Sequence, residues 1–209
     1  MSRILITSGP TRQYLDPVRY LSNASSGRMG SALAAAAVAA GHEVVVVSGP
    51  VDVAYPAEAE VIRIVSTEEM LEACQAVFPT CDGLIAAAAP CDYRPVEVAD
   101  QKMAKTGGEL VLRLVETPDI VASLAENKQS QWIVAFALET HQRHERALEK
   151  LRRKRCDLIV ANGPEAINAV GTSLDVLDPQ GDVLATLGGK KTEVAEGLFD
   201  IISSRLIHR

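Results

Sequence analysis

The chain has 209 residues, 47% of them hydrophobic, which is enough for one core of ordinary size. Its formal net charge of −6 leaves no surplus of basic residues for a nucleic-acid backbone. No segment has the pattern of a signal peptide, and the longest apolar run, 32–40, is shorter than the roughly 20 residues that a membrane helix needs. We therefore expect one soluble cytoplasmic domain over residues 1–209, with no nucleic-acid or membrane partner.

Strand-like apolar runs alternate with helical patterns along the chain. Strands are predicted at 3–7 and 43–47, and the helix between them, 26–40, ends at Gly41, which suits a left-handed cap. Residues 90–108 show little periodicity and are predicted to form a long flap. The other predicted elements are helix 67–78, strand 83–87, strand 109–115, helix 118–126, strand 132–135, helix 141–153, strand 157–161, a hairpin of strands 173–177 and 183–187, and helix 192–206.

This alternation predicts an α/β fold of three layers, Rossmann-like and doubly wound, with a mostly parallel sheet and an antiparallel hairpin at its C-terminal edge. Ligands of such sheets bind outside the carboxyl ends of the parallel strands. A dinucleotide cofactor is disfavoured, because the first strand and its helix are not joined by G-x-G-x-x-G and no Tyr-x-x-x-Lys occurs. An NAD(P)-dependent oxidoreductase is therefore the weaker alternative.

The cysteines and histidines give no recognisable metal-binding spacing. His141 and His144 are three residues apart on a predicted helix, so both could face one metal ion, but their polar neighbours favour exposure to solvent. The four cysteines form no C-x-x-C pair and are expected to be reduced thiols: Cys74, Cys81, Cys91 and Cys156.

Ser25, Ser26 and Gly27 stand where the helix after the first strand is predicted to begin. The free N–H groups of a helix N-terminus, the helix dipole and two hydroxyls together suit a phosphate or a carboxylate. An ordinary serine N-cap is the alternative explanation of this triplet. Arg19 and Asn23 favour the anion site, because they add a cation and a carboxamide just upstream.

The sequence SGPTRQYLDPVRYLSNASSGRMG, residues 8–30, resembles the signature of the phosphopantothenate-cysteine ligase family. The similarity covers about residues 3–162 and, more weakly, the last helix. In many bacteria members of this family form the C-terminal half of a fusion with a flavin decarboxylase. The other segments that carry the resemblance follow in the family's order: VVVVSGPV, AAAAPCDYRP, QKMAK, ETPDIVASLA, VAFALET and CDLIVAN.

The resemblance implies a ligase that joins 4'-phosphopantothenate and cysteine in coenzyme A biosynthesis. A nucleoside triphosphate, CTP or ATP, would convert the substrate carboxylate into an acyl-nucleotidylate with release of pyrophosphate. The cysteine amine would then displace the nucleoside monophosphate. The resemblance also implies Mg²⁺ on the phosphates, a homodimer whose flap reaches a neighbouring site, and a flavin decarboxylase that acts next in the pathway.

By its position, Asn23 resembles the family's asparagine that holds the acyl-nucleotidylate, with Arg19 beside it. Lys102 resembles the flap lysine that closes over the triphosphate, and the triplet at 25–27 would hold the substrate phosphate. Asp92 is in addition a candidate ligand of Mg²⁺. The positions that match nucleotide-binding residues of the family are Ala86, Ala87, Ala88, Asp92, Lys102, Pro118, Asp119, Ile120, Val121, Phe136, Lys150 and Lys154.

Several of these residues also have an ordinary structural interpretation. Phe136 could belong to the core, and Lys150 and Lys154 could form the exposed face of a helix. Two segments depart from the family pattern. Pro90-Cys91 replaces a small apolar pair, which leaves the choice between CTP and ATP open, and the family's Ser-Asp-Asn is not found in 165–178. A non-catalytic nucleotide-binding module of the same fold is therefore the alternative function.

Overall fold

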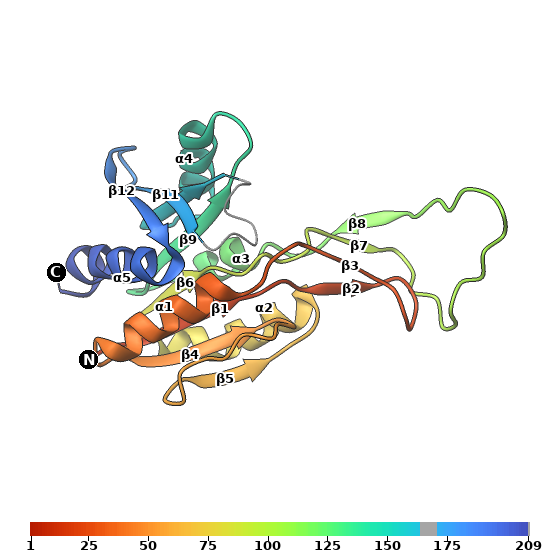
Figure 1. Cartoon of the computed structure of the whole chain (residues 1–209), viewed down its shortest axis with the longest axis horizontal. Helices are drawn as coiled ribbons and strands as arrows, with labels where there is room; N and C mark the ends of the chain where they lie inside the picture. The colour runs from red at the N-terminus through yellow and green to blue at the C-terminus, as the bar shows by residue number, and fades with distance from the viewer. Residues whose placement is uncertain (164–170, 209) are drawn as a thin grey trace.

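An eight-stranded sheet forms the centre of the computed structural model, which describes residues 1–163 and 171–208 (Figure 1). Its strands are β1 (Arg3–Ser8), β4 (Glu43–Ser48), β5 (Glu60–Arg63), β6 (Gly83–Ala86), β9 (Trp132–Leu138), β10 (Leu158–Asn162), β11 (Gly171–Leu177) and β12 (Val183–Lys190). They lie in the order β12-β11-β10-β9-β6-β1-β4-β5. Neighbouring strands from β5 to β10 are parallel, whereas β10–β11 and β11–β12 are antiparallel. The predicted sheet and its antiparallel edge are confirmed.

Helices cover both faces of the sheet and complete three layers. One face carries α1 (Arg28–Ala39) and α5 (Lys191–Ile202), which continues as a π-helical turn, Ser203–Ile207. The other face carries α2 (Thr67–Val77), which is extended by a 3₁₀ turn at Phe78–Thr80, together with α3 (Ile120–Glu126) and α4 (Arg143–Arg153). Because successive side chains of a strand point to opposite faces, β1 contributes to both cores.

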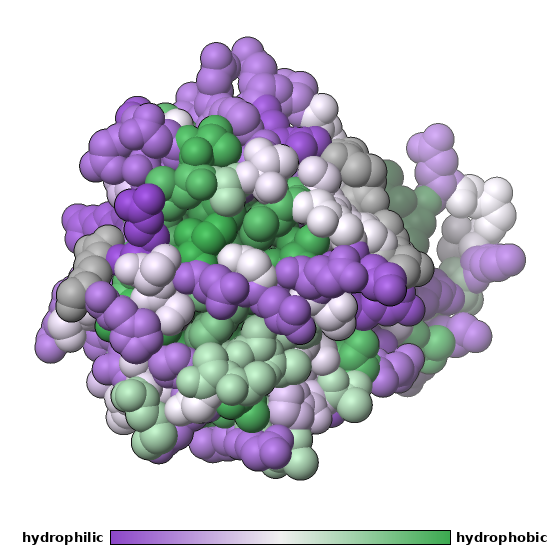
Figure 2. All heavy atoms as spheres, turned by 60° about the vertical axis from the view of Figure 1, so that its left-hand side comes forward, coloured by the Kyte–Doolittle hydropathy of each residue, from purple (hydrophilic) through white to green (hydrophobic). Residues whose placement is uncertain are grey.

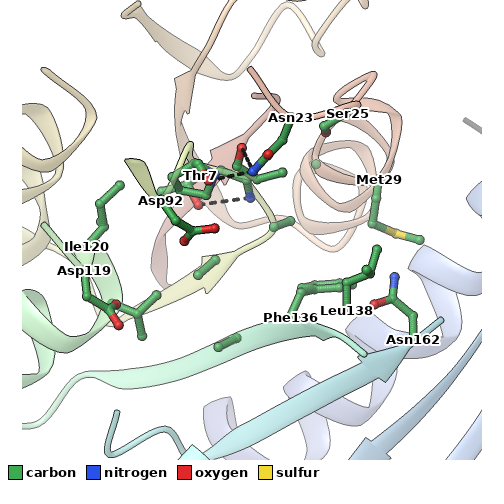
Figure 3. Close-up of a pocket in the computed structure, with 18 of the residues that line it drawn as sticks. Thr7, Asn23, Ser25, Met29, Asp92, Asp119, Ile120, Phe136, Leu138 and Asn162 are labelled. Carbon is green, nitrogen blue, oxygen red and sulfur yellow. Dashed lines mark hydrogen bonds between the residues drawn. The ribbon is translucent and has the colours of Figure 1, made fainter. Parts of the chain in front are cut away.

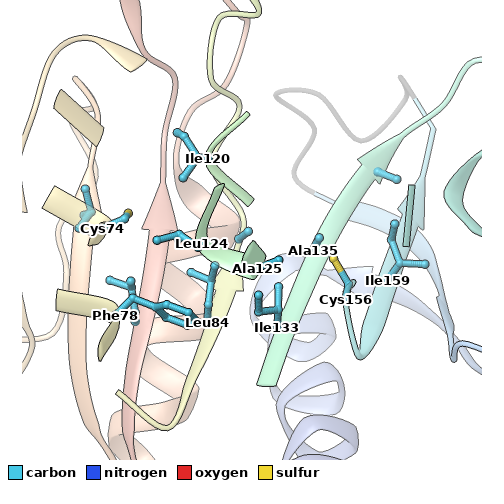
Figure 4. Close-up of a cluster of buried hydrophobic side chains, with 14 of the residues drawn as sticks. Cys74, Phe78, Leu84, Ile120, Leu124, Ala125, Ile133, Ala135, Cys156 and Ile159 are labelled. Carbon is cyan, nitrogen blue, oxygen red and sulfur yellow. The ribbon is translucent and has the colours of Figure 1, made fainter. Parts of the chain in front are cut away.

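Figure 4 shows the core that lies between the sheet and the layer of α2, α3 and α4. Cys74 and Cys156 belong to this cluster, and burial raises the pKa of each thiol to about 12. Neither thiol therefore ionises at neutral pH. All four cysteines are buried and free, as the sequence predicts.

The direction of winding reverses between β1 and β6. The chain proceeds from β1 to β4 and β5 on one side, then returns to β6 on the other side of β1 and continues to β12. Connections that leave the carboxyl ends of β1 and β6 therefore diverge, which opens a crevice at this edge of the sheet. The carboxyl ends of β9 and β10 lie along the same edge, because these strands run parallel to β6.

Glycine at position 30 lets α1 approach the carboxyl end of β1. A Cβ atom on Gly30 would lie 2.2 Å from Ser8 Oγ and 2.5 Å from Ser8 Cβ, far inside normal contact distance. The N-terminus of α1 is thereby held against the crevice. At its other end the helix stops before Gly41, whose φ of +81° confirms the predicted left-handed position.

A long arm, residues 12–22 and 93–116, projects from the sheet (Figure 1). It contains two antiparallel pairs, β2 (Arg12–Tyr14) with β3 (Tyr20–Ser22) and β7 (Tyr93–Pro95) with β8 (Leu114–Glu116). The prediction of a flap without a packed element is wrong at β7, and the strand predicted at 109–115 is limited to 114–116. Tyr93 pairs with Glu116, a partner too distant in sequence for a local pattern to indicate.

The remaining predicted elements are confirmed apart from their ends, and β5 is an additional strand. The departure from the family pattern at 165–178 falls partly on 164–170, which lie outside the described residues, and partly on β11. Among the described residues, no helix combines the length and the apolar character needed to cross a bilayer.

The close approach at Gly30 gives the first testable prediction. Gly30→Ala should lower the free energy of unfolding by about 1–3 kcal/mol, because the added methyl group overlaps Ser8 and must push α1 away from β1. Chemical denaturation measures this change. Gly108→Ala is the control, since a Cβ there has no neighbour within 4 Å. Equal stability of the two variants would contradict the packing described.

Candidate functional site

A cavity of about 740 Å³ lies at the carboxyl ends of the parallel strands (Figure 3). It is bounded by the start of α1, the loop after β6, the start of α3, the end of β9 and the C-terminal part of α4. The cavity is thus where the doubly wound fold predicts a ligand. Among the positions identified from sequence, those that line it are Asn23, Ser25, Ser26, Gly27, Ala86, Ala87, Ala88, Asp92, Pro118, Asp119, Ile120, Val121, Phe136, Lys150 and Lys154.

The N-terminus of α1 has the properties of an anion site. Its N-cap residue is Gly27, in the left-handed conformation with φ +73°, and no side chain caps the first turn. The interpretation of Ser25 or Ser26 as an ordinary N-cap is therefore wrong, and both residues line the cavity instead. Because the first N–H groups of a helix have no partner within it, those of α1 remain available to a ligand.

Asn23 joins this segment to the loop that follows β6. Its side-chain nitrogen donates to the carbonyl oxygens of Pro90, at 2.8 Å, and Ala89, at 3.4 Å (Figure 3). These bonds fix the carboxamide at the rim of the cavity, and its oxygen can still accept a hydrogen bond.

A ring of hydrogen bonds through the buried hydroxyl groups of Thr11 and Thr67 also holds the loop that follows β6. The N–H of Cys91 donates to Thr11 Oγ1, at 2.7 Å, and Thr67 Oγ1 donates to the carbonyl of Cys91, at 3.1 Å. The two hydroxyls are 2.8 Å apart, and since the single proton of Thr67 is already used, Thr11 must donate to Thr67. Thr117 donates to the Cys91 carbonyl as well, at 2.7 Å. The peptide of Cys91, next to Asp92, is therefore fully bonded.

Lys150 of α4 and Lys154, the residue that follows α4, line the cavity and form ion pairs there. Lys150 Nζ lies 2.6 Å from Glu139 Oε1, and Lys154 Nζ lies 3.0 Å from Asp119 Oδ2. Asp119 also caps α3 by accepting from the N–H of Ala122. The side chains of Lys150 and Lys154 are only 38% and 21% exposed, and both line the cavity, so the alternative of a freely exposed face is wrong.

Phe136 is half-buried near the end of β9, where it lines the cavity and also packs against the core on the side of α1 and α5 (Figure 3). Its neighbours there include residues that no sequence motif indicates. Asn162 is the last residue of β10, the last parallel strand, and this position alone could have identified it. Those additional cavity residues include Thr7, Arg28, Met29, Leu138, Asn162, Thr172 and Lys191.

Arg28 and Lys191 add positive charge at the part of the cavity next to α5. Burial, and in addition the charge of Arg28, lower the pKa of Lys191. An anion bound here would stabilise the charged form of Lys191 and so raise its pKa.

Arg19 and Lys102 do not line the cavity with the other predicted residues. The guanidinium of Arg19 donates to the carbonyl of Met103, at 2.7 Å, and lies 3.6 Å from Asp16 Oδ2. Lys102 is exposed on the arm. The expectation that Arg19 lies beside Asn23 in one site is therefore wrong within a single chain, because β2, β3 and the turn between them carry Arg19 out along the arm (Figure 1).

Neither the carboxylates nor the histidines of residues 1–163 and 171–208 form a group of three that could hold a metal ion. His144 is half-exposed, with Nε2 2.7 Å from Asp175 Oδ2. Asp92 presents one exposed carboxylate at the cavity. Because Mg²⁺ typically takes one or two carboxylates and completes its shell with phosphates and water, Asp92 fits an ion that enters with a triphosphate.

The chain is similar to known proteins over nearly its whole length. The family model of the DNA/pantothenate metabolism flavoprotein C-terminal domain matches residues 1–206. The coenzyme A biosynthesis bifunctional protein CoaBC of Vibrio vulnificus is 40% identical over 194 residues, which are 90% of this chain and 48% of that protein. The chain thus spans about half the length of the curated relatives that it matches.

Solved structures share the fold. The crystal structure of the C-terminal domain of a CoaBC protein superimposes with a TM-score of 0.84 at 34% identity and covers 100% of this chain and 97% of that one. A Cab2 mutant in complex with phosphopantothenate-cysteine gives a TM-score of 0.81 over 99% of this chain and 87% of that one. At 15% identity the second likeness supports the fold alone.

The hydroxyl ring below the cavity gives the second prediction. Thr67→Val should lower the free energy of unfolding by about 1–3 kcal/mol, because it leaves the buried hydroxyl proton of Thr11 without an acceptor. Thermal or chemical denaturation checks the change. Thr192→Val, at an exposed position, is the matched control and should be nearly neutral. A Thr67 variant as stable as the control would rule out the ring.

Proposed function

Because the chain belongs to the family of the DNA/pantothenate metabolism flavoprotein C-terminal domain, we propose that it is a ligase of coenzyme A biosynthesis. It joins 4'-phosphopantothenate and cysteine, and CTP or ATP supplies the energy through an acyl-nucleotidylate. The observation that carries this proposal is one cavity that contains both an open helix N-terminus and a set of positions matching nucleotide-binding residues.

The cavity provides what activation of a carboxylate requires. A carboxylate and a triphosphate repel each other, so positive charge has to offset the charge of both reactants. Lys150 and Lys154 supply it at the end of α4 by exchanging their ion pairs with Glu139 and Asp119 for the phosphates, and the N–H groups of α1 supply it at the other side of the cavity. Mg²⁺ on Asp92 and the phosphates would supply further charge neutralisation when bound.

In the first step, an oxygen of the substrate carboxylate attacks the α-phosphorus of the nucleotide and pyrophosphate leaves. In the second step, the cysteine amine attacks the acyl carbon, the nucleoside monophosphate leaves with the attacking carboxylate oxygen, and the amine loses a proton. Asn23, fixed to Ala89 and Pro90, is placed to orient the acyl group between these steps.

We also propose that the protein acts as a homodimer in which the arm serves the cavity of the partner. The family resemblance implies that Lys102 and Arg19 act on the reactants. In this chain, however, both residues lie on the arm and do not line the cavity (Figure 1). Many of the exposed large apolar side chains among the described residues also lie on the arm, which recedes at the right of Figure 2. A second copy would cover this surface and complete both sites.

The third prediction concerns Asn23. The protein should release pyrophosphate when phosphopantothenate, cysteine, Mg²⁺ and CTP or ATP are present. Asn23→Ala should lower the rate of product formation by about 10²-fold or more while the acyl-nucleotidylate accumulates, because the second step loses its orienting group. Mass spectrometry of quenched reactions detects the intermediate. Measurable nucleotide binding without pyrophosphate release would favour a non-catalytic binding module instead.

The fourth prediction tests the exchange of arms. Asn23→Ala and Lys102→Ala should each have little activity alone. An equal mixture of the two, unfolded and refolded together, should recover about a quarter of the wild-type activity, because half of the dimers are mixed and each of these has one intact site. Separate refolding of each variant is the control. A mixture no more active than the separate variants would mean that both residues act within one chain.

A further inference from the structure

The turn between β2 and β3 contains a carboxylate that is fully buried. The Asp16 side chain has no exposed surface, although it lies on the arm and not in the core. Its Oδ1 accepts from the N–H groups of Val18 and Arg19, both at 2.8 Å, which closes the turn. A buried carboxylate is costly unless its oxygens are bonded, so the partners of Oδ2 also matter.

Asp16 Oδ2 binds the segment that carries Lys102. It accepts from the N–H of Met103 at 3.2 Å, and Arg19 Nη1 lies 3.6 Å away. Arg19 Nη2 donates at the same time to the carbonyl of Met103, at 2.7 Å. The Asp16–Arg19 pair therefore holds both polar groups of the Met103 main chain.

Few other contacts fix this part of the arm. The N–H of Ala99 donates to the carbonyl of Leu15, at 3.0 Å, and Val96 binds Arg113 near the base. Lys102 itself is exposed, so its position depends on the main chain next to it. The position of Lys102 therefore depends on the hydrogen bonds that the next residue, Met103, makes with Asp16 and Arg19.

We propose that Asp16 is a positioning residue that holds Arg19 and Lys102 in one fixed arrangement, so that both cations reach the reactants together. This inference rests on the proposed function for the role of the two cations. It adds that Asp16, which does not touch the cavity, determines how well the arm is ordered before a ligand binds.

The charge of Asp16 suits this role. Burial raises the pKa of its carboxyl, but the N–H groups of Val18, Arg19 and Met103 and the charge of Arg19 lower it below its ordinary value overall. The carboxyl is therefore ionised at neutral pH. Replacing it with a carboxamide removes the negative charge and one of the two acceptor oxygens.

Asp16→Asn is the direct test. If the oxygen of the carboxamide keeps the turn, its NH₂ group faces the N–H of Met103 and the guanidinium of Arg19, to which it cannot offer an acceptor. We expect amide hydrogen exchange at 99–105 to accelerate at least tenfold and trypsin to cleave faster after Lys102 and Lys105. The kcat of ligation should fall about 10–100-fold, with little change in the KM for nucleotide.

Asp100→Asn is the matched control, because this exposed carboxylate of the arm has the same chemistry. It should change neither hydrogen exchange nor kcat. Met103→Pro is the second variant, since it removes the N–H that binds Asp16 and leaves the turn at Val18 and Arg19 in place. It should reproduce the fall in kcat even if Asp16→Asn is too unstable to purify.

The outcomes separate the two proposals. Faster exchange together with a lower kcat supports the positioning role. Unchanged exchange, or faster exchange with an unchanged kcat, overturns it. Hydrogen exchange needs no substrate, so a wild-type protein without ligase activity would refute the proposed function and still leave the order of the arm measurable.

Discussion

The site depends on how closely α1 approaches the end of β1. Gly30 allows this approach, and Gly27 begins the helix without a side chain over its first turn. The unpaired N–H groups of α1 are therefore directed at the crevice where the connections of β1 and β6 diverge. A side chain at either position would separate the helix from the strand or be strained at the positive φ of residue 27.

The loop after β6 links the cavity to the arm. Asn23 donates to the main chain of this loop at Pro90. The hydroxyls of Thr11, Thr67 and Thr117 bind the main chain of the same loop at Cys91. The arm leaves the body from this fixed point, at β2 on one side and β7 on the other. The base of the arm is thus bonded to the body through this loop, whereas the part around Lys102 is held mainly by Asp16 and Arg19.

Local sequence signals predict the mostly parallel, doubly wound sheet and its antiparallel edge, whereas most of the cavity positions came from the resemblance to the ligase family. Strand and helix periods are visible in single segments, and the triplet at 25–27 marks a helix start that can bind an anion. The flap at 90–108 was predicted, but the strand pairs that build the arm were not, because β7 pairs with β8 across a long loop and because β2 and β3 form a hairpin whose turn is closed by Asp16. The position of Arg19 was wrong for the same reason. The polar pattern of α4 gave no sign that Lys150 and Lys154 pair with Glu139 and Asp119 at a cavity.

We propose that the cavity activates a carboxylate by transferring it to a nucleotide. Phosphopantothenate labelled with ¹⁸O in both carboxylate oxygens tests it most directly, with mass spectrometry of the released nucleotide after reaction with cysteine. We expect one ¹⁸O atom in the nucleoside monophosphate and none in the pyrophosphate. Unlabelled monophosphate, or label in a phosphate released from another position of the nucleotide, would contradict it.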